Sequence, residues 1–416
     1  MPPTEEAPAG AQAGPYRRGA LLRRVVPVAK RVRDTLRPGP RLKEYDPVSN
    51  LVGPANDVTS ARFPVVDIHT HLGRWLTPDG SWMAPDLGAL FDTFDALNVR
   101  SVVNLDGRWG DELEANLDRY DRAHPDRFAT FCQLDFAVLD GAGNPDDLVR
   151  SLESSHRAGA RGLKVWKNLG MIAKVGDRIL MPDDPLLDPI WQAAGSLALP
   201  VLVHVADPVA FFQPMDRHNE RLEELLAHPS ISQAHHGVTG RHRIIESFEA
   251  VVASHPDTTF IGAHVGCNAE NLPWVTRMLD TYPNFWIDTS ARSDLGRQPR
   301  QAAKLIERHS DRVLFGADVF PIDPEAYKLY FRLLETEDEY FRYAPPGKHV
   351  AEQGRWTVSG LGLPGDVLEK LYSHNARRLL GWESPQNPGD SAKSTADPRK
   401  ITGDSGTGSE APANSR

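Results

Sequence analysis

The sequence is poor in cysteine and contains no long apolar run. Its 416 residues include two cysteines, Cys132 and Cys267. Two are too few for a disulfide framework, so we expect a reducing, cytoplasmic location. A membrane-spanning helix needs about 18 or more consecutive apolar residues, and no such run occurs, so no membrane span is expected. Acidic residues outnumber basic ones by 56 to 47, which argues against nucleic acid as a partner.

The composition is otherwise that of a globular protein, with 40% apolar and 25% charged residues. Residues 1–45 hold ten Lys and Arg against four acids, and we interpret residues 1–60 as an N-terminal extension. Residues 384–416 contain no aromatic residue and are rich in Ser, Gly, Pro and Asp. Such a segment cannot bury enough apolar surface to offset its ordering entropy, which predicts a disordered tail. One folded domain over residues 61–383 remains.

Eight short β-branched segments recur in this domain, and amphipathic stretches with helical spacing separate them. Most of these segments start about 26 to 40 residues apart, and an insertion at 208–240 lengthens the gap after the fifth. The segments are 64–69, 100–105, 128–134, 161–166, 200–205, 259–264, 285–290 and 312–317. Alternating strands and helices imply a parallel sheet, and eight repeats predict an α/β fold of the (β/α)₈ TIM barrel type. The alternative, an open doubly wound sheet, would need a glycine-rich phosphate loop after the first strand.

Polar side chains stand where several of these strands end. The first strand ends in Asp67-Ile68-His69-Thr70-His71. Because alternate strand residues point to one side, His69 and His71 are expected to point to the barrel axis. Further polar residues follow the fourth, fifth, sixth and eighth strands, namely Lys164, His204, His264 and Asp318. Active sites of this fold lie at the carboxyl ends of the strands. Imidazoles and a carboxylate converging there predict a transition-metal site, most simply zinc, with an open position for water.

At this point the sequence resembles the amidohydrolase superfamily of metal-dependent barrels. The phrases VVDIHTHLG, RGLKVWKNLG, LPVLVHVADP, HPDTTFIGAHVG, NFWIDTSAR, RVLFGAD and YSHNARRLLGW are most similar to its amidohydrolase-related branch. That branch includes aminocarboxymuconate semialdehyde decarboxylase. The resemblance implies one divalent metal ion held by four side chains, those of His69, His71, His204 and Asp318. It also implies that His264 acts beside them as a base or electrophilic helper.

Lys164 leaves a second arrangement open. In two-metal members of the superfamily a lysine at this place is carboxylated and bridges two ions. His204 and His264 then hold the second ion. We favour one ion, because lysines at this point also occur in one-metal relatives.

The residues predict an enzyme acting on a small, anionic molecule. Asp318 and His264 are the candidate proton acceptors, and Lys164 and Arg292 are the candidate cations that stabilise negative charge. Our main interpretation is a metal-dependent hydrolase that cleaves a C–N or C–O bond with metal-activated water. The alternative is a metal-dependent nonoxidative decarboxylase, a lyase, acting on an unsaturated or aromatic acid. A third hypothesis is a catalytically silent barrel that serves as a binding protein. The resemblance also makes a homodimer an expectation.

Overall fold

The fold was analysed in a computed structural model, which describes residues 48–141, 143–343 and 353–382. The chain divides into two units, Met1–Val52 with Pro346–Val350 and Gly53–Pro345 with Ala351–Arg416. Of the first unit, only residues 48–52 are described, and they are exposed. Most of the expected N-terminal extension and the whole expected tail over 384–416 lie outside the described residues. The domain boundaries therefore stay a prediction.

Eight parallel strands form the centre of the second unit. They pair in two groups, in the orders β1-β2-β3 and β10-β9-β8-β7-β4. The strands are β1 (Val65–Thr70), β2 (Val99–Asn104), β3 (Phe128–Thr130), β4 (Leu163–Val165), β7 (Val201–Val203), β8 (Phe260–Gly262), β9 (Phe285–Asp288) and β10 (Val313–Leu314). Each lies within or beside one of the eight segments expected from the sequence.

Backbone contacts close both gaps between the two groups. A parallel bridge between Cys132 and Leu163 joins the end of β3 to β4. On the other side, the Ile68 amide of β1 donates to the Phe315 carbonyl after β10, at 3.0 Å. The strands therefore form a closed ring, and the predicted (β/α)₈ barrel is confirmed.

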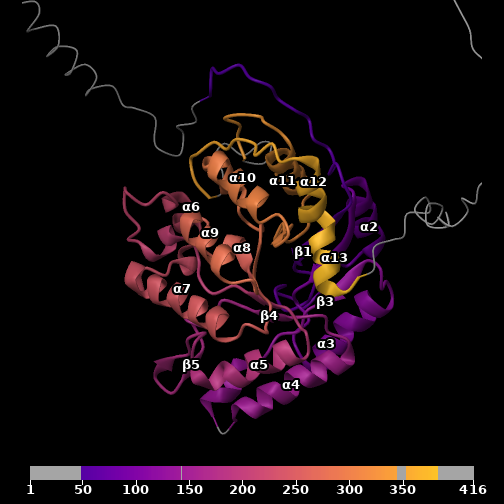
Figure 1. The fold of residues 1–416 in the computed structure, drawn as a ribbon, viewed down its shortest axis with the longest axis vertical. Helices are drawn as coiled ribbons and strands as arrows, with labels where there is room; N and C mark the ends of the chain where they lie inside the picture. The colour runs from indigo at the N-terminus through magenta and orange to yellow at the C-terminus, as the bar shows by residue number, and fades with distance from the viewer. Residues whose placement is uncertain (1–47, 142, 344–352, 383–416) are drawn as a thin grey trace, which may run out of the picture. The chain divides into compact units, whose positions relative to one another are not determined.

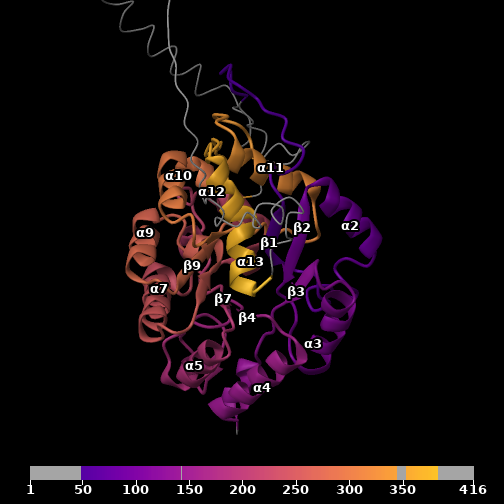
Figure 2. The ribbon, with the colours of Figure 1, turned by 45° about the vertical axis from the view of Figure 1, so that its right-hand side comes forward.

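Helices lie around the strands, as Figures 1 and 2 show. They are α2 (Leu87–Ala96), α3 (Gly110–Leu117), α4 (Pro145–Ala158), α5 (Asp188–Ser196), α6 (Leu222–Ala227), α7 (Gly237–Ser254), α8 (Ala263–Gly266), α9 (Leu272–Thr281), α10 (Pro299–Arg308), α11 (Pro324–Glu335), α12 (Gly365–Glu369) and α13 (Asn375–Leu380). Local sequence explains α4 well. Asn144 and Asp147 form a capping box at its start, and Gly159 ends it with a φ of 125°.

Two loops are more structured than the sequence suggested. A two-stranded antiparallel hairpin, β5 (Lys174–Val175) with β6 (Arg178–Ile179), lies in the connection between β4 and α5. These strands of two residues are too short to produce a recognisable alternation. The expected insertion after β7 contains the short helix α6, and α7 begins at Gly237, four residues before the amphipathic stretch that predicted it.

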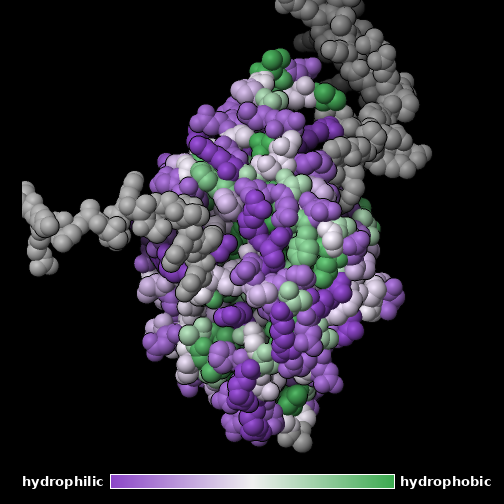
Figure 3. Space-filling view, turned by 90° about the vertical axis from the view of Figure 1, so that its right-hand side faces the viewer, coloured by the Kyte–Doolittle hydropathy of each residue, from purple (hydrophilic) through white to green (hydrophobic). Residues whose placement is uncertain are grey.

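The described helices contain none that is long and apolar enough to cross a membrane. The longest of them, α7, has 18 residues and carries several charged side chains. Figure 3 shows one face of the molecule, on which hydrophilic residues predominate and apolar ones lie in small separate groups.

Phe315 is the centre of an aromatic cluster that joins β10 to the helices after it. Its side chain is fully buried. It contacts four aromatic rings with centroid distances of 5.4–6.5 Å, those of Tyr327, Tyr330, Phe331 and Tyr372. Aromatic pairs at these distances add to the free energy gained by burying their apolar surface.

Replacing Phe315 with Ala is expected to lower the free energy of unfolding by about 3–5 kcal/mol, because the lost ring leaves a cavity among four fixed neighbours. Urea unfolding followed by tryptophan fluorescence measures this. The matched control is Leu226→Ala, since Leu226 is 61% exposed and should change stability by less than about 0.5 kcal/mol. Similar urea concentrations at the unfolding midpoints of the two variants would show that the packing of Phe315 does not stabilise the fold.

Candidate metal centre

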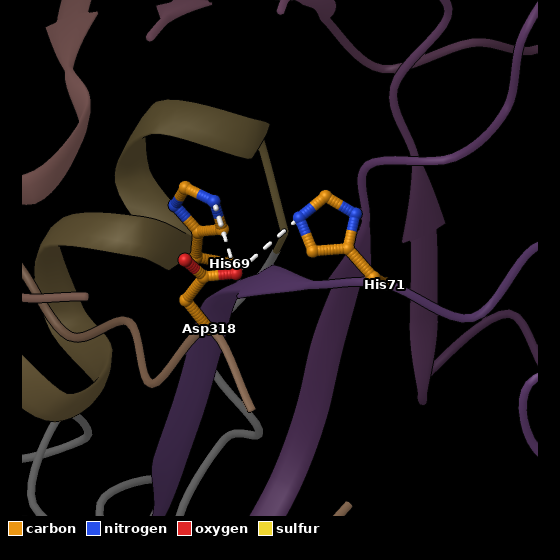
Figure 4. A group of neighbouring side chains, drawn as sticks. All are labelled: His69, His71 and Asp318. Carbon is orange, nitrogen blue, oxygen red and sulfur yellow. Dashed lines mark ion pairs between the residues drawn. The ribbon is translucent and has the colours of Figure 1, made fainter. Parts of the chain in front are cut away.

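The carboxyl end of β1 brings two imidazoles to the barrel axis, and the segment after β10 places a carboxylate between them. Asp318 Oδ1 lies 3.4 Å from His71 Nε2 and 3.8 Å from His69 Nε2. Figure 4 shows the Asp318 carboxylate pointing toward both rings. Potential ligand atoms of the three residues all lie within 4.8 Å of one another. They form a compact group of nitrogen and oxygen donors at the mouth of the barrel.

These donors fit a divalent ion. His71 Nε2 and Asp318 Oδ1 are both buried, and neither has a hydrogen-bond partner among the described residues. Buried polar atoms without a partner are rare, because each costs desolvation free energy. His-His-carboxylate sets are typical zinc ligands, and a metal ion would satisfy both of these atoms at once.

The charge states of Asp318 and His69 also suit a cation, whereas His71 would have to release a proton to bind one. Burial by itself would raise the pKa of Asp318, but the adjacent His69 and His71 outweigh it and hold that pKa below its ordinary value of 3.8. Burial drives the pKa of His69 well below 6.5, so this ring is neutral and its Nε2 carries a lone pair, which Lys164 Nζ approaches to 3.3 Å. For His71, burial lowers the pKa, but the closely bound Asp106 outweighs it and raises the pKa to about 9.

Two buried acids that the sequence analysis did not single out orient the imidazoles. Asp106 Oδ1, after β2, lies 2.7 Å from His71 Nδ1, and Asp288 Oδ2, at the end of β9, lies 2.8 Å from His69 Nδ1. Each contact engages Nδ1 and leaves Nε2 facing Asp318. Carboxylates behind histidine ligands commonly fix the ring orientation in this way. Both acids end barrel strands, in VVNLD and FWID, so the argument used for Asp318 would have found them.

His264 lies beside the three-residue group and His204 lies behind it. His264 Nε2 is 3.9 Å from Asp318 Oδ2 and 3.2 Å from His204 Nδ1. His204 Nε2 faces Asp207 at 3.5 Å. The structure therefore brings three of the four expected ligands together, whereas His204 contacts the group through His264. Burial lowers the pKa of both rings, for His204 to about 4.

The two expected cations have different surroundings. Lys164 Nζ is buried and lies 3.3 Å from His69 Nε2, and burial lowers its pKa to about 8. Arg292, after β9, is 5% exposed, and its Nη1 bonds only the neighbouring Ala291 carbonyl, at 3.1 Å. Lys164 thus contacts the candidate ligand His69 directly, and no such contact of Arg292 is found among the described residues.

Comparison with known proteins agrees with this geometry. The profile of a family described as amidohydrolase matches residues 66–382, which is most of the chain. The chain belongs to the amidohydrolase family. It is therefore an enzyme of a metal-dependent family, and the resemblance seen in the sequence is confirmed. No curated protein matches it.

Solved structures with the same fold include two at a TM-score of 0.50. An amidohydrolase from Staphylococcus aureus is 16% identical, with 77% of this chain and 100% of that chain covered. A dihydroxybenzoic acid decarboxylase from Polaromonas sp. contains manganese and the inhibitor 2-nitroresorcinol. It is 13% identical, with 77% of this chain and 97% of that chain covered. At these identities the likeness concerns the fold.

A cavity of about 580 Å³ in this amidohydrolase is lined by two residues that contact the histidines, Lys164 against His69 and Trp166 against His71. Lys164 and Trp166, from β4 and the residue after it, line the cavity, as do Trp75, Arg108 and Trp109 from the loops after β1 and β2. The Trp166 ring lies edge-on to His71 and to Trp75, with centroid distances of 5.2 and 5.1 Å. The volume of the cavity is that of a small-molecule site, and the cavity walls combine aromatic faces with cations.

Asp106→Asn is expected to lower metal affinity about 10- to 100-fold, because a neutral amide orients His71 less firmly than a carboxylate does. Fluorescent-chelator competition with the purified protein measures the affinity. Asp92→Asn is the control, since Asp92 is exposed on α2. Unchanged affinity in Asp106→Asn, with the fold intact by circular dichroism, would refute this role of Asp106.

Proposed function

We propose that this amidohydrolase is a metal-dependent nonoxidative decarboxylase, a lyase, acting on a small aromatic or unsaturated carboxylic acid. The observation that carries the proposal is the cavity beside the histidines, which joins flat aromatic walls to the buried cation Lys164. Aromatic walls suit a planar substrate, and a buried ammonium group suits its carboxylate. The Polaromonas decarboxylase of the same fold supports this choice over our initial interpretation as a hydrolase.

His69, His71 and Asp318 are the proposed metal ligands. His204, the fourth ligand that the resemblance implied, would have to turn its Nε2 from Asp207 toward the ion. We favour one ion, because in the other nearby group of donors, His69 with His264 and Asp288, the Asp288 carboxylate already engages His69 Nδ1 and the His264 amide. Zinc is the first metal to test with these donors, and manganese is the second, because the Polaromonas enzyme contains it. A bound divalent ion supplies Lewis acidity and lowers the pKa of a water molecule bound to it.

The protein's own residues then have three tasks. Lys164 holds the substrate carboxylate by a charge-assisted hydrogen bond. His264 and Asp318, 3.9 Å apart, hold the proton and pass it to the substrate carbon. Protonation of that carbon precedes cleavage of its bond to the carboxylate, whose electron pair stays on the substrate as CO₂ leaves. The reaction consumes one proton.

Product analysis tests the proposal directly. The full chain, loaded separately with zinc and with manganese, is incubated with aromatic and unsaturated acids whose carboxyl carbon is isotopically labelled. Release of labelled CO₂, absent in His71→Ala, is the expected result. Hydrolysis of a C–N or C–O bond would instead add water to the substrate mass and would restore the hydrolase interpretation. No turnover with either metal across amides, esters, lactones and acids would favour the silent barrel.

A homodimer and a cytoplasmic location, expected from the sequence, stay predictions. Size-exclusion chromatography with light scattering tests the first of them, and cell fractionation tests the second.

A further inference from the structure

The cavity wall contains a second cation whose charge the proposed chemistry leaves unused. Arg108, in the loop after β2, is half-buried between Trp75 and Trp109, with its guanidinium carbon 5.2 and 4.1 Å from their ring centroids. Its Nη1 donates a hydrogen bond to the side-chain amide oxygen of Gln133, at 3.2 Å. Within the described part of the chain, Arg108 forms no ion pair. A partly desolvated guanidinium without a carboxylate partner is costly, and a bound anion would remove that cost.

The surrounding structure holds Arg108 in place. Its backbone adopts a left-handed φ of 56°, which is unfavourable for a residue with a side chain. Its carbonyl oxygen accepts a hydrogen bond from the Gln133 amide at 2.8 Å, which ties the loop to the segment after β3. Gln133 therefore holds both the strained backbone and the side chain of Arg108, and the guanidinium is positioned before any ligand arrives.

The other charged groups that line the cavity are differently placed. Asp135 accepts a hydrogen bond from the Ala137 amide and Asp140 from the Gly176 amide, so both carboxylates are engaged by nearby backbone. Lys174, in the β5–β6 hairpin, is exposed to water. Burial lowers the pKa of Arg108, an effect that Asp135 opposes, but an arginine remains charged at neutral pH. Arg108 is thus the best-placed of these groups to bind an anion.

We propose that Arg108 binds a second anionic group of the substrate, so that the cavity selects planar acids carrying two acidic groups over acids carrying one. This inference rests on the proposed function, because Lys164 is there assigned to the carboxylate that leaves. Arg108 and Lys164 both line the cavity, and a flat ring can lie between them against the tryptophan faces. The guanidinium fork can donate two parallel hydrogen bonds to one carboxylate, which gives direction as well as charge.

Binding of simple aromatic acids tests this assignment without requiring turnover. Titration calorimetry with the zinc-loaded full chain compares benzoate with isophthalate and terephthalate. At least one dicarboxylate is expected to bind about tenfold more tightly than benzoate, as for a hydrogen bond to a charged group. Arg108→Gln should remove this preference, Arg108→Lys should keep part of it, and the matched control Lys174→Gln should keep nearly all of it.

The outcomes separate this proposal from the decarboxylase assignment. Equal binding of mono- and dicarboxylates by the unmodified chain, or an unchanged preference in Arg108→Gln, would overturn the role of Arg108. An equal loss in Lys174→Gln would also overturn it, by showing that only the total charge matters. A preference that depends on Arg108 in a chain that releases no CO₂ would support the anion site and count against the decarboxylase alone.

Discussion

Asp318→Asn should remove the bound metal and lower kcat/KM by about a thousandfold or more. The Asp318 carboxylate lies between the Nε2 atoms of His69 and His71 and supplies the negative charge of this group. A neutral amide is a much weaker ligand for a divalent cation. Asn keeps the size of the side chain and tolerates the left-handed φ of 55° at this position, so the backbone should be unaffected.

Metal content and turnover are measured on the same preparations, by elemental analysis after zinc loading and by CO₂ release. Asp257→Asn is the matched control, because Asp257 is exposed at the turn before β8 and should leave both quantities unchanged. A variant at Asp318 that keeps one ion per chain with full affinity would show that the ion binds elsewhere. The carboxylate would then act on protons alone.

The barrel was predictable because its signal is repeated. Most residues of the eight short strands are buried, as in Phe260–Gly262, so the strands appear as mainly apolar segments between helices with a clear apolar face. The convergence of three candidate ligands was predictable for a related reason. In a closed parallel barrel all strands end at the same mouth, so His69, His71 and Asp318 had to be neighbours once the topology was known.

The finer structure of the site depends on side-chain and loop geometry that a linear pattern does not encode. His204 directly follows β7, and His69 lies near the end of β1. The Nε2 of His204 nevertheless faces Asp207 and not Asp318. The backbone after β8 turns into left-handed conformations at His264 and Val265, with φ values of 55° and 60°, although neither residue is a glycine. Hydrogen bonds to the neighbouring strand, such as that from the His264 amide to Asp288 Oδ1 of β9 at 2.8 Å, hold this turn.

Close packing around the site likewise appears only in three dimensions. Gly316 follows β10, and a Cβ atom there would lie 2.9 Å from the Cβ of His69. Any side chain at this position would have to displace the histidine. A glycine in the sequence RVLFGAD suggests a turn, whereas its role is to give His69 room beside the neighbouring strand.

His264→Asn is expected to lower kcat about a hundredfold or more while leaving the metal bound, because loss of a positioned acid–base group typically costs this much. His264 Nε2 faces Asp318 Oδ2 at 3.9 Å, and His264 Nδ1 lies 2.9 Å from the Ser290 hydroxyl. The His264 ring therefore lies next to His69, His71 and Asp318 but is not one of these three candidate ligands. Asn accommodates the left-handed backbone at this position, so the turn should persist.

The contrast with Asp318→Asn separates proton transfer from metal binding. If His264→Asn retains zinc but releases CO₂ slowly, His264 acts on the substrate and not on the metal. The control is His156→Asn, because His156 lies at an exposed position of α4. Loss of zinc to the same extent as in Asp318→Asn would contradict this division. It would make His264 a ligand in place of His204, because the two rings contact each other and only one of them needs to face the ion.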